Sequence, residues 1–145
     1  MIHSQAAKDV IMVLPQSIGT TQVTGRIDSR NADWVTIKYI GDTAAAGDVL
    51  TVLKIGYGDT TSAFTDMTTA VGGGTGGFTI PAPNTSTGDV IKFEIDKVKY
   101  PYRYFQISIT GDATARLTSV LGTLSRNKIN PDTDSEAGCT EVVYC

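Results

Sequence analysis

Residues Val90 to Ile95 read VIKFEI, and apolar and charged side chains alternate along this stretch. Such alternation is typical of a β-strand that turns one face to a hydrophobic core and the other face to water. Glu94 and Asp96 lie two residues apart, so they share one face of this strand. We therefore expect a strand here, with these two carboxylates in solvent.

Other parts of the chain repeat this pattern of short strand-like runs. They are rich in β-branched and aromatic residues, and Gly, Asp, Asn or Pro stand at their ends. The last run has leucines near helical spacing, but its threonines and Gly122 favour a strand. Short strands at regular spacing predict an all-β sandwich or barrel. The runs are Asp9–Leu14, Gln22–Asp28, Trp34–Ile40, Asp48–Tyr57, Tyr102–Ile109 and Ala113–Leu124.

The glycine-rich stretch Ala70 to Phe78, AVGGGTGGF, contains the spacing G-x-G-x-x-G that can mark a nucleotide-binding loop. Such a loop needs a helix directly after it, because the helix N-terminus carries the phosphate. Pro81 and Pro83 follow instead and forbid a helix at that point. We therefore predict no nucleotide site, and a long surface loop from Thr65 to Gly88.

Length, composition and charge narrow the classes of function. A chain of 145 residues has the length of one domain. With 41% apolar and 19% charged residues it is neither disordered by composition nor embedded in a membrane. A net charge of −3 makes it a poor candidate for binding nucleic acid. We expect neither nucleic acid nor membrane among its partners.

Residue types that perform chemistry are scarce. There is one histidine, His3, and the two cysteines, Cys139 and Cys145, both lie near the C-terminus. The sequence therefore predicts no catalytic residues, no metal site, no cofactor and no enzyme activity. The cysteines could form a small disulfide ring, bond to a neighbouring chain, or stay as thiols in a reducing cytosol. Aspartates next to glycine favour turns over calcium ligation; they are Asp42, Asp59, Asp89 and Asp112.

Two groups of residues are candidates for contact with a partner. Tyr100, Tyr102 and Tyr104 lie two apart and could form a platform for a sugar or a protein, or a half-buried sheet surface. We predict that the polar tail from Asn127 is an extended arm, which ends in a short apolar run. Its candidate contact residues are Ile129, Val142, Val143 and Tyr144.

Four stretches resemble the capsid decoration, or cement, proteins of tailed bacteriophages, a family of small β-sandwich proteins. They match its turn "D-x-R-x", its strands "D-x-L-x-V" and "R-Y-x-x-[IV]", and its closing strand in Leu-Gly. The glycine loop and the tail with two cysteines depart from the family pattern. The stretches are GRIDSRNADWVTI (25–37), DVLTVLKIGYGD (48–59), KYPYRYFQISITG (99–111) and SVLG (119–122).

This resemblance implies a single antiparallel β-sandwich, jelly-roll-like, with extended N- and C-terminal arms. We divide the chain into an N-terminal arm or first strand (1–14), the sandwich (15–125) and a C-terminal arm (126–145). The implied protein is made in the bacterial host cytoplasm and sits on the capsid exterior of the virion, where it bridges subunits of the major capsid protein.

The family resemblance also implies self-association, as a homotrimer or as a dimer. Two other classes of function stay open beside the decoration protein. One is a carbohydrate-binding module or tail-associated adhesin, for which the tyrosine row would be the contact surface. The other is a hydrolase that uses carboxylates on the sandwich.

Overall fold

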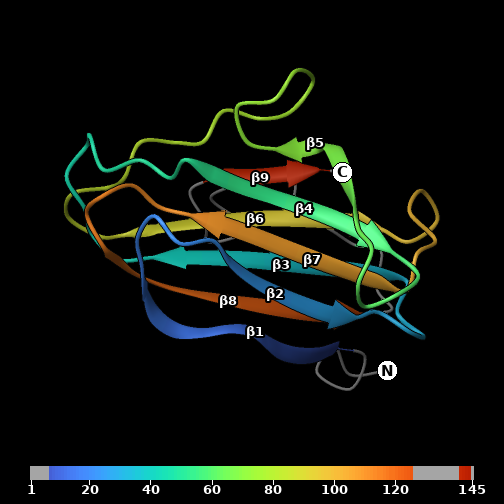
Figure 1. Cartoon of the computed structure of the whole chain (residues 1–145). Helices are drawn as coiled ribbons and strands as arrows, with labels where there is room; N and C mark the ends of the chain where they lie inside the picture. Colours follow the sequence, from blue (N-terminus) through green and yellow to red (C-terminus); the bar gives the residue numbers. More distant parts are fainter. Residues whose placement is uncertain (1–6, 126–140, 145) are drawn as a thin grey trace.

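The computed structural model describes residues 7–125 and 141–144, and this part of the chain contains strands but no helix (Figure 1). It accordingly holds no helix long and apolar enough to cross a membrane. The strands are β1 (Ala7–Ile18), β2 (Val23–Asp28), β3 (Trp34–Gly41), β4 (Val52–Gly58), β5 (Thr65–Val71), β6 (Asp89–Asp96), β7 (Tyr104–Thr110), β8 (Arg116–Ser125) and β9 (Glu141–Tyr144).

The strands form two stacked sheets, which confirms the predicted β-sandwich. One sheet has the order β1-β8-β3-β6-β9 and the other has the order β2-β7-β4-β5. The first eight strands therefore have the topology of a jelly roll, in which two Greek keys share two sheets. Their pairings are antiparallel, whereas β9 pairs with β6 in parallel. Figure 1 shows the two layers, with β2, β7 and β4 in front of β8, β3 and β6.

The hydrophobic core lies between the two sheets and follows the alternation of the sequence. On β6, Ile91, Phe93 and Ile95 are buried, and Phe105 and Ile107 of β7 are buried in the facing sheet. Burying one such side chain contributes roughly 1.5–3 kcal/mol relative to leaving it in water. The inward positions of the strands thus hold the two sheets together.

The expectation that Glu94 faces solvent is wrong. Glu94 is only 2% exposed, although its side chain lies on the outer side of β6, away from the core. Lys92 Nζ lies 2.5 Å from Glu94 Oε1, and Thr36 Oγ1 donates a hydrogen bond of 2.7 Å to Glu94 Oε2. The indole N–H of Trp34 donates to the same oxygen. The alternation predicts which side chains leave the core, but not whether that outer surface is covered.

The predicted loop from Thr65 to Gly88 is wrong for its first seven residues. These residues form β5, which pairs with β4 and buries Met67 and Ala70. The glycines that follow make a tight reversal, in which Gly73 and Gly76 have φ values of 73° and 77°. These values lie in the left-handed region, which glycine enters without a steric penalty.

Several strand ends differ from the expected ones. β4 begins at Val52, because a turn with a 2.9 Å hydrogen bond from Asp48 N to the Ala45 carbonyl occupies the residues before it. β7 begins at Tyr104, two residues after the start of the expected run, and ends at Thr110, one residue beyond it. β1 runs through the boundary that we placed after residue 14 and forms an outer strand of its sheet.

Candidate functional site

The two outer faces of the sandwich differ in chemistry. The outward side chains of the four-stranded sheet are mostly polar, and we call this surface the polar face; it includes Thr24, Arg26, Lys54, Gln106 and Ser108. The other sheet carries exposed apolar side chains on β1, β3 and β8. We call the surface around Ile11, Ile40 and Leu117 the apolar face.

The apolar face exposes large side chains to water. Ile11 is 62% exposed, Leu117 56% and Ile40 39%. The strand register places Ile11 opposite Leu121 and Ile40 opposite Ser119 on one side of the sheet. Ile40 and Leu117 line a hollow of about 300 Å³. Its lining residues are Pro15, Ile40, Gly41, Asp42, Thr87, Leu117, Thr118 and Ser119.

Contiguous apolar patches on an exposed surface are typical of sites that contact another molecule. The sequence analysis did not identify this surface. The outward positions of β1 and β8 can be recognised only when the register between these two strands is known.

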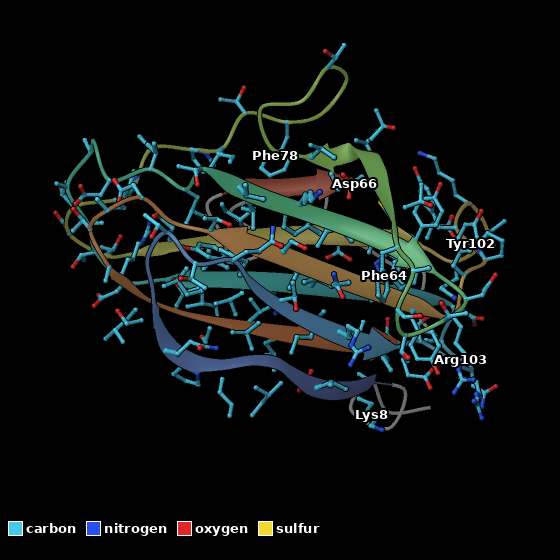
Figure 2. All side chains as sticks on the ribbon, viewed as in Figure 1. Lys8, Phe64, Asp66, Phe78, Tyr102 and Arg103 are labelled. Carbon is cyan, nitrogen blue, oxygen red and sulfur yellow. The ribbon has the colours of Figure 1, made fainter. Side chains whose placement is uncertain are left out.

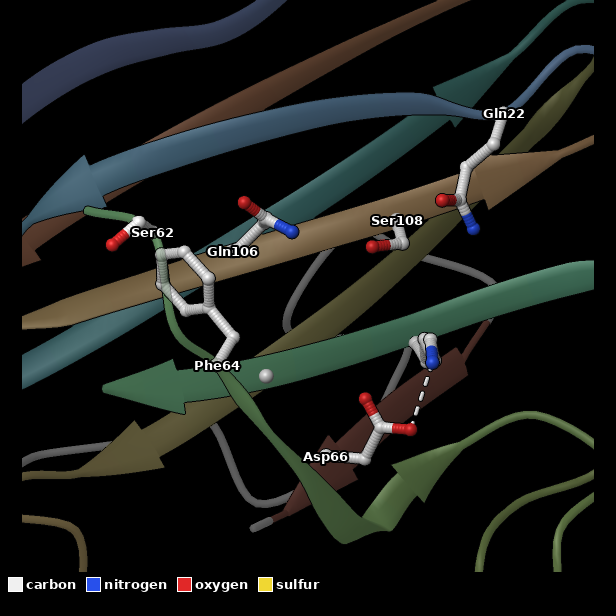
Figure 3. Close-up of a pocket in the computed structure, with 8 residues that line it drawn as sticks. Gln22, Ser62, Phe64, Asp66, Gln106 and Ser108 are labelled. Carbon is white, nitrogen blue, oxygen red and sulfur yellow. Dashed lines mark hydrogen bonds and ion pairs between the residues drawn. The ribbon is translucent and has the colours of Figure 1, made fainter. Parts of the chain in front are cut away.

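A second hollow lies on the polar face and has a volume of about 260 Å³ (Figure 3). Strands β4, β5 and β7 form its floor, and the loop between β4 and β5 brings Ser62 and Phe64 over it. In Figure 3 the ring of Phe64 points toward Gln106. The lining residues are Gln22, Lys54, Gly56, Ser62, Phe64, Asp66, Gln106 and Ser108.

Specific contacts keep this hollow open. Lys54 Nζ and Asp66 Oδ2 form an ion pair of 2.7 Å across β4 and β5. Arg26 donates a hydrogen bond to the Thr61 carbonyl and so ties the β4–β5 loop to β2. Gly56 leaves room in the floor, where an added Cβ would lie 3.2 Å from the Phe64 Cβ atom. The sequence analysis identified none of these residues as functional.

The three predicted tyrosines do not form a row on one strand. Tyr104 lies in β7, whereas Tyr100 and Tyr102 lie in the loop before it. Figure 2 shows Tyr102 at one end of the sandwich. The ring of Tyr102 stacks on Tyr57 with 4.2 Å between centroids, and Tyr100 tilts against the same ring at 5.5 Å. Tyr57, which the sequence analysis did not identify, is therefore the centre of this aromatic cluster.

Charged groups fix the loop that carries these tyrosines. Arg103 forms an ion pair of 2.7 Å with Asp28, and its guanidinium lies 4.7 Å from the Tyr104 ring centre. The hydrogen bond from Arg103 lowers the pKa of Asp28. Burial lowers the pKa of Lys97, whose ammonium group donates to Ser29 Oγ at 2.9 Å and to the Tyr102 carbonyl.

Two of the four aspartates at glycine-aspartate pairs bond to a residue just ahead of them, in agreement with the predicted turns. Asp42 Oδ1 accepts a hydrogen bond from Thr43 N at 2.7 Å, and Asp112 Oδ1 accepts one from Thr114 N at 2.8 Å. The other two differ: Asp59 accepts from the distant Arg103 N at 3.3 Å, and Asp89 at the start of β6 forms a buried ion pair with Arg116. Within residues 7–125 and 141–144, no three acidic, histidine or cysteine side chains gather as metal ligands.

The C-terminal candidates fall partly within the described structure. Val142, Val143 and Tyr144 belong to β9, where their backbone pairs with Lys92, Phe93 and Glu94 of β6. Ile129, Cys139 and Cys145 lie outside the described residues. The contact role and the disulfide therefore stay predictions.

Comparison with known proteins relates this chain to others by fold only. The sequence matches no family model and no curated protein. Among solved structures it is similar to VP2 of the infectious bursal disease virus subviral particle, with a TM-score of 0.51 and 10% identity. That alignment covers 84% of this chain and 33% of VP2. The chain thus has a fold found in a viral capsid protein.

Two further solved structures are more distant. A protein of the disulfide-linked pili of Bacillus endospore appendages has a TM-score of 0.44 and 13% identity, with 84% of this chain and 90% of that chain covered. A β-porphyranase from the gut bacterium Bacteroides plebeius has a TM-score of 0.46 and 12% identity. That alignment covers 86% of this chain and 21% of the enzyme.

Proposed function

We propose that this chain is a structural virion protein that binds the outside of a phage head and stabilises the shell by bridging major capsid protein subunits. The apolar face is the observation that carries the proposal, because it exposes Ile40 and Leu117 at a hollow on a sheet of the sandwich. The jelly-roll topology and the similarity in fold to VP2 support the same class of function.

The apolar face suits a partner that is itself a rigid protein surface. Covering it removes apolar area from water, which contributes about 25 cal/mol for each Å² buried. The hollow beside Leu117 accommodates a protruding apolar side chain of the shell protein. In protein interfaces a few central, fully desolvated side chains carry most of the binding energy. Self-association as a homotrimer, or as a dimer, would place several copies of this face on neighbouring shell subunits.

Immunogold electron microscopy of purified phage particles from the lysate that encodes the chain tests this proposal. We expect label spread over the heads. Label at the tail tip would instead favour the adhesin, and bare particles would contradict a virion role.

Two matched substitutions then test the apolar face. We expect Leu117→Asp to abolish binding to heads, because a charge on this surface cannot be desolvated cheaply. Val98→Asp provides the control, since Val98 is 73% exposed but lies in the loop between β6 and β7. Equal binding by both variants would overturn the assignment of this face.

A further inference from the structure

The hollow on the polar face contains polar side chains that have free hydrogen-bonding capacity. The side chains of Gln22, Ser62, Gln106 and Ser108 line it, and none of them forms a hydrogen bond to another described residue. Ser108 is only 6% exposed. Gln22 and Ser62 are exposed and Gln106 is partly exposed, so the polar groups of the hollow bond to water and stay available to a ligand.

The charges in the hollow do not favour an ionic ligand. The ammonium group of Lys54 is neutralised by Asp66 at 2.7 Å, and these two are the only charged residues among the eight that line the hollow. A phosphate or a carboxylate would have to break this pair before it gained a cation. A nucleic acid needs several unpaired cations along its backbone. The hollow therefore fits an uncharged ligand.

The polar lining and the position of the hollow disfavour two further classes of ligand. A purely apolar ligand would cover the amides and hydroxyls without replacing their hydrogen bonds to water, which costs free energy. An extended peptide binds most readily along a free strand edge, where it can continue the ladder of backbone hydrogen bonds. This hollow instead lies on the face of the sheet, over β4, β5 and β7.

We propose that this hollow binds an uncharged carbohydrate. A sugar ring presents hydroxyl groups at its rim and C–H groups on its faces. The Gln22 and Gln106 amides can each donate to one hydroxyl and accept from another, and Ser108 can do the same from the floor. The Phe64 ring supplies the apolar surface against which a sugar face packs. At about 260 Å³ the hollow holds a short stretch of a glycan whose remainder continues into solvent.

This site is independent of the proposed function, because the two surfaces lie on opposite faces of the sandwich. Leu117→Asp should therefore leave glycan binding unchanged, and substitutions in the hollow should leave head binding unchanged. Failure of one proposal is thereby distinguishable from failure of the other.

An array of neutral oligosaccharides from plant and bacterial polysaccharides, probed with the full chain, tests the proposal first. We expect binding to at least one glycan and a tenfold or greater loss of affinity in Phe64→Ala and in Gln106→Ala. Gln16→Ala is the matched control for Gln106, since Gln16 is exposed on β1 in the other sheet, and we expect it to bind as the unsubstituted chain does.

An NMR titration of the unsubstituted chain with the same glycan gives a second readout that does not depend on how the variants fold. We expect the largest shifts at the amides of β4, β7 and the β4–β5 loop. Silence across the neutral array, binding restricted to sulfated or sialylated glycans, or shifts confined to another surface would each overturn the proposal.

Discussion

Arg116 and Asp89 form an ion pair whose two side chains are both buried, and Arg116 Nε also donates to the Asp42 carbonyl at 3.2 Å. Removing one partner of such a pair leaves a buried charge uncompensated. We expect Arg116→Ala to lower the free energy of unfolding by about 3–5 kcal/mol. Urea denaturation at pH 7 measures this loss.

Lys54→Ala provides the comparison, because the Lys54–Asp66 pair is partly exposed. Pairs of this kind contribute about 1 kcal/mol or less. If Arg116→Ala lowered the free energy of unfolding no more than Lys54→Ala does, the buried pair would contribute no more to stability than the partly exposed pair.

The pH dependence of Asp28 follows from its contact with Arg103. The hydrogen bond from Arg103 is the largest cause that lowers the pKa of this carboxyl group. The unfolded chain therefore binds a proton at a higher pH than the folded chain does. The pair stabilises the fold fully above the unfolded pKa, and this contribution disappears as the pH falls through the lower folded pKa.

NMR titration of the Asp28 carboxyl carbon measures this pKa. We expect Arg103→Ala to raise it toward the ordinary aspartate value. Arg30→Ala should raise it less, because the charge of Arg30 is the smallest of the causes that lower it. A pKa that stayed unchanged in Arg103→Ala would contradict the assignment.

Single residues were the least predictable part of this molecule. The sequence shows that Glu94 and Arg116 are charged, but their partners Thr36 and Asp89 lie 58 and 27 positions away. A pattern of alternation carries no information about such pairings. The residues of the polar hollow were missed for the same reason, because Phe64 and Ser108 come from separate parts of the chain.

At the level of elements, Gly25 controls how closely β2 approaches β1. A Cβ at this position would overlap the Met12 carbonyl and crowd the Val13 side chain. We expect Gly25→Ala to push β1 away and to cost about 1–3 kcal/mol, as overpacking does. Hydrogen exchange of the β1 amides, followed by NMR, should become faster.

Gly47→Ala is the matched control, because an added Cβ there meets nothing within 4 Å. We expect its exchange rates to equal those of the unsubstituted chain. Unchanged protection of β1 in Gly25→Ala would mean that the two strands are not held by this close approach.

The strands themselves were predictable where alternation or β-branched residues marked them. β3 and β6 lie within one residue of the expected runs at each end. β5 was missed because its residues, TDMTTAV, show no regular alternation and lead directly into glycines. Pairing with β4 and the burial of Met67 stabilise it as a strand.

For the molecule as a whole, the core depends on residues 7–125. The core cluster that runs from Met12 to Leu124 lies within that range. We expect a chain truncated after Ser125 to keep a cooperative thermal transition, and to bind phage heads more weakly because it lacks the C-terminal arm. Calorimetry and a head-binding assay measure the two effects. Undiminished head binding would remove the arm from the proposed function.

The fold class could be predicted from the sequence, but the jelly-roll topology was expected only by resemblance. Runs of β-branched and aromatic residues that end at glycine or aspartate indicate many short strands. Which strands become neighbours depends on contacts between distant segments, such as the pairing of β1 with β8. The apolar face and the polar hollow both arise from those pairings, so neither could be located before the register was known.

The irregular pairing of β1 has a consequence for how copies of this chain can crowd together. β1 is an outer strand of 12 residues, and its register shifts between Ile11 and Val13 and again between Val13 and Gln16. Pro15 adds a position without an amide hydrogen. Such irregularities make the sheet edge a poor template for hydrogen bonding with a strand of a second chain. At high local concentration, neighbouring copies can then meet face to face without joining their sheets into a fibre.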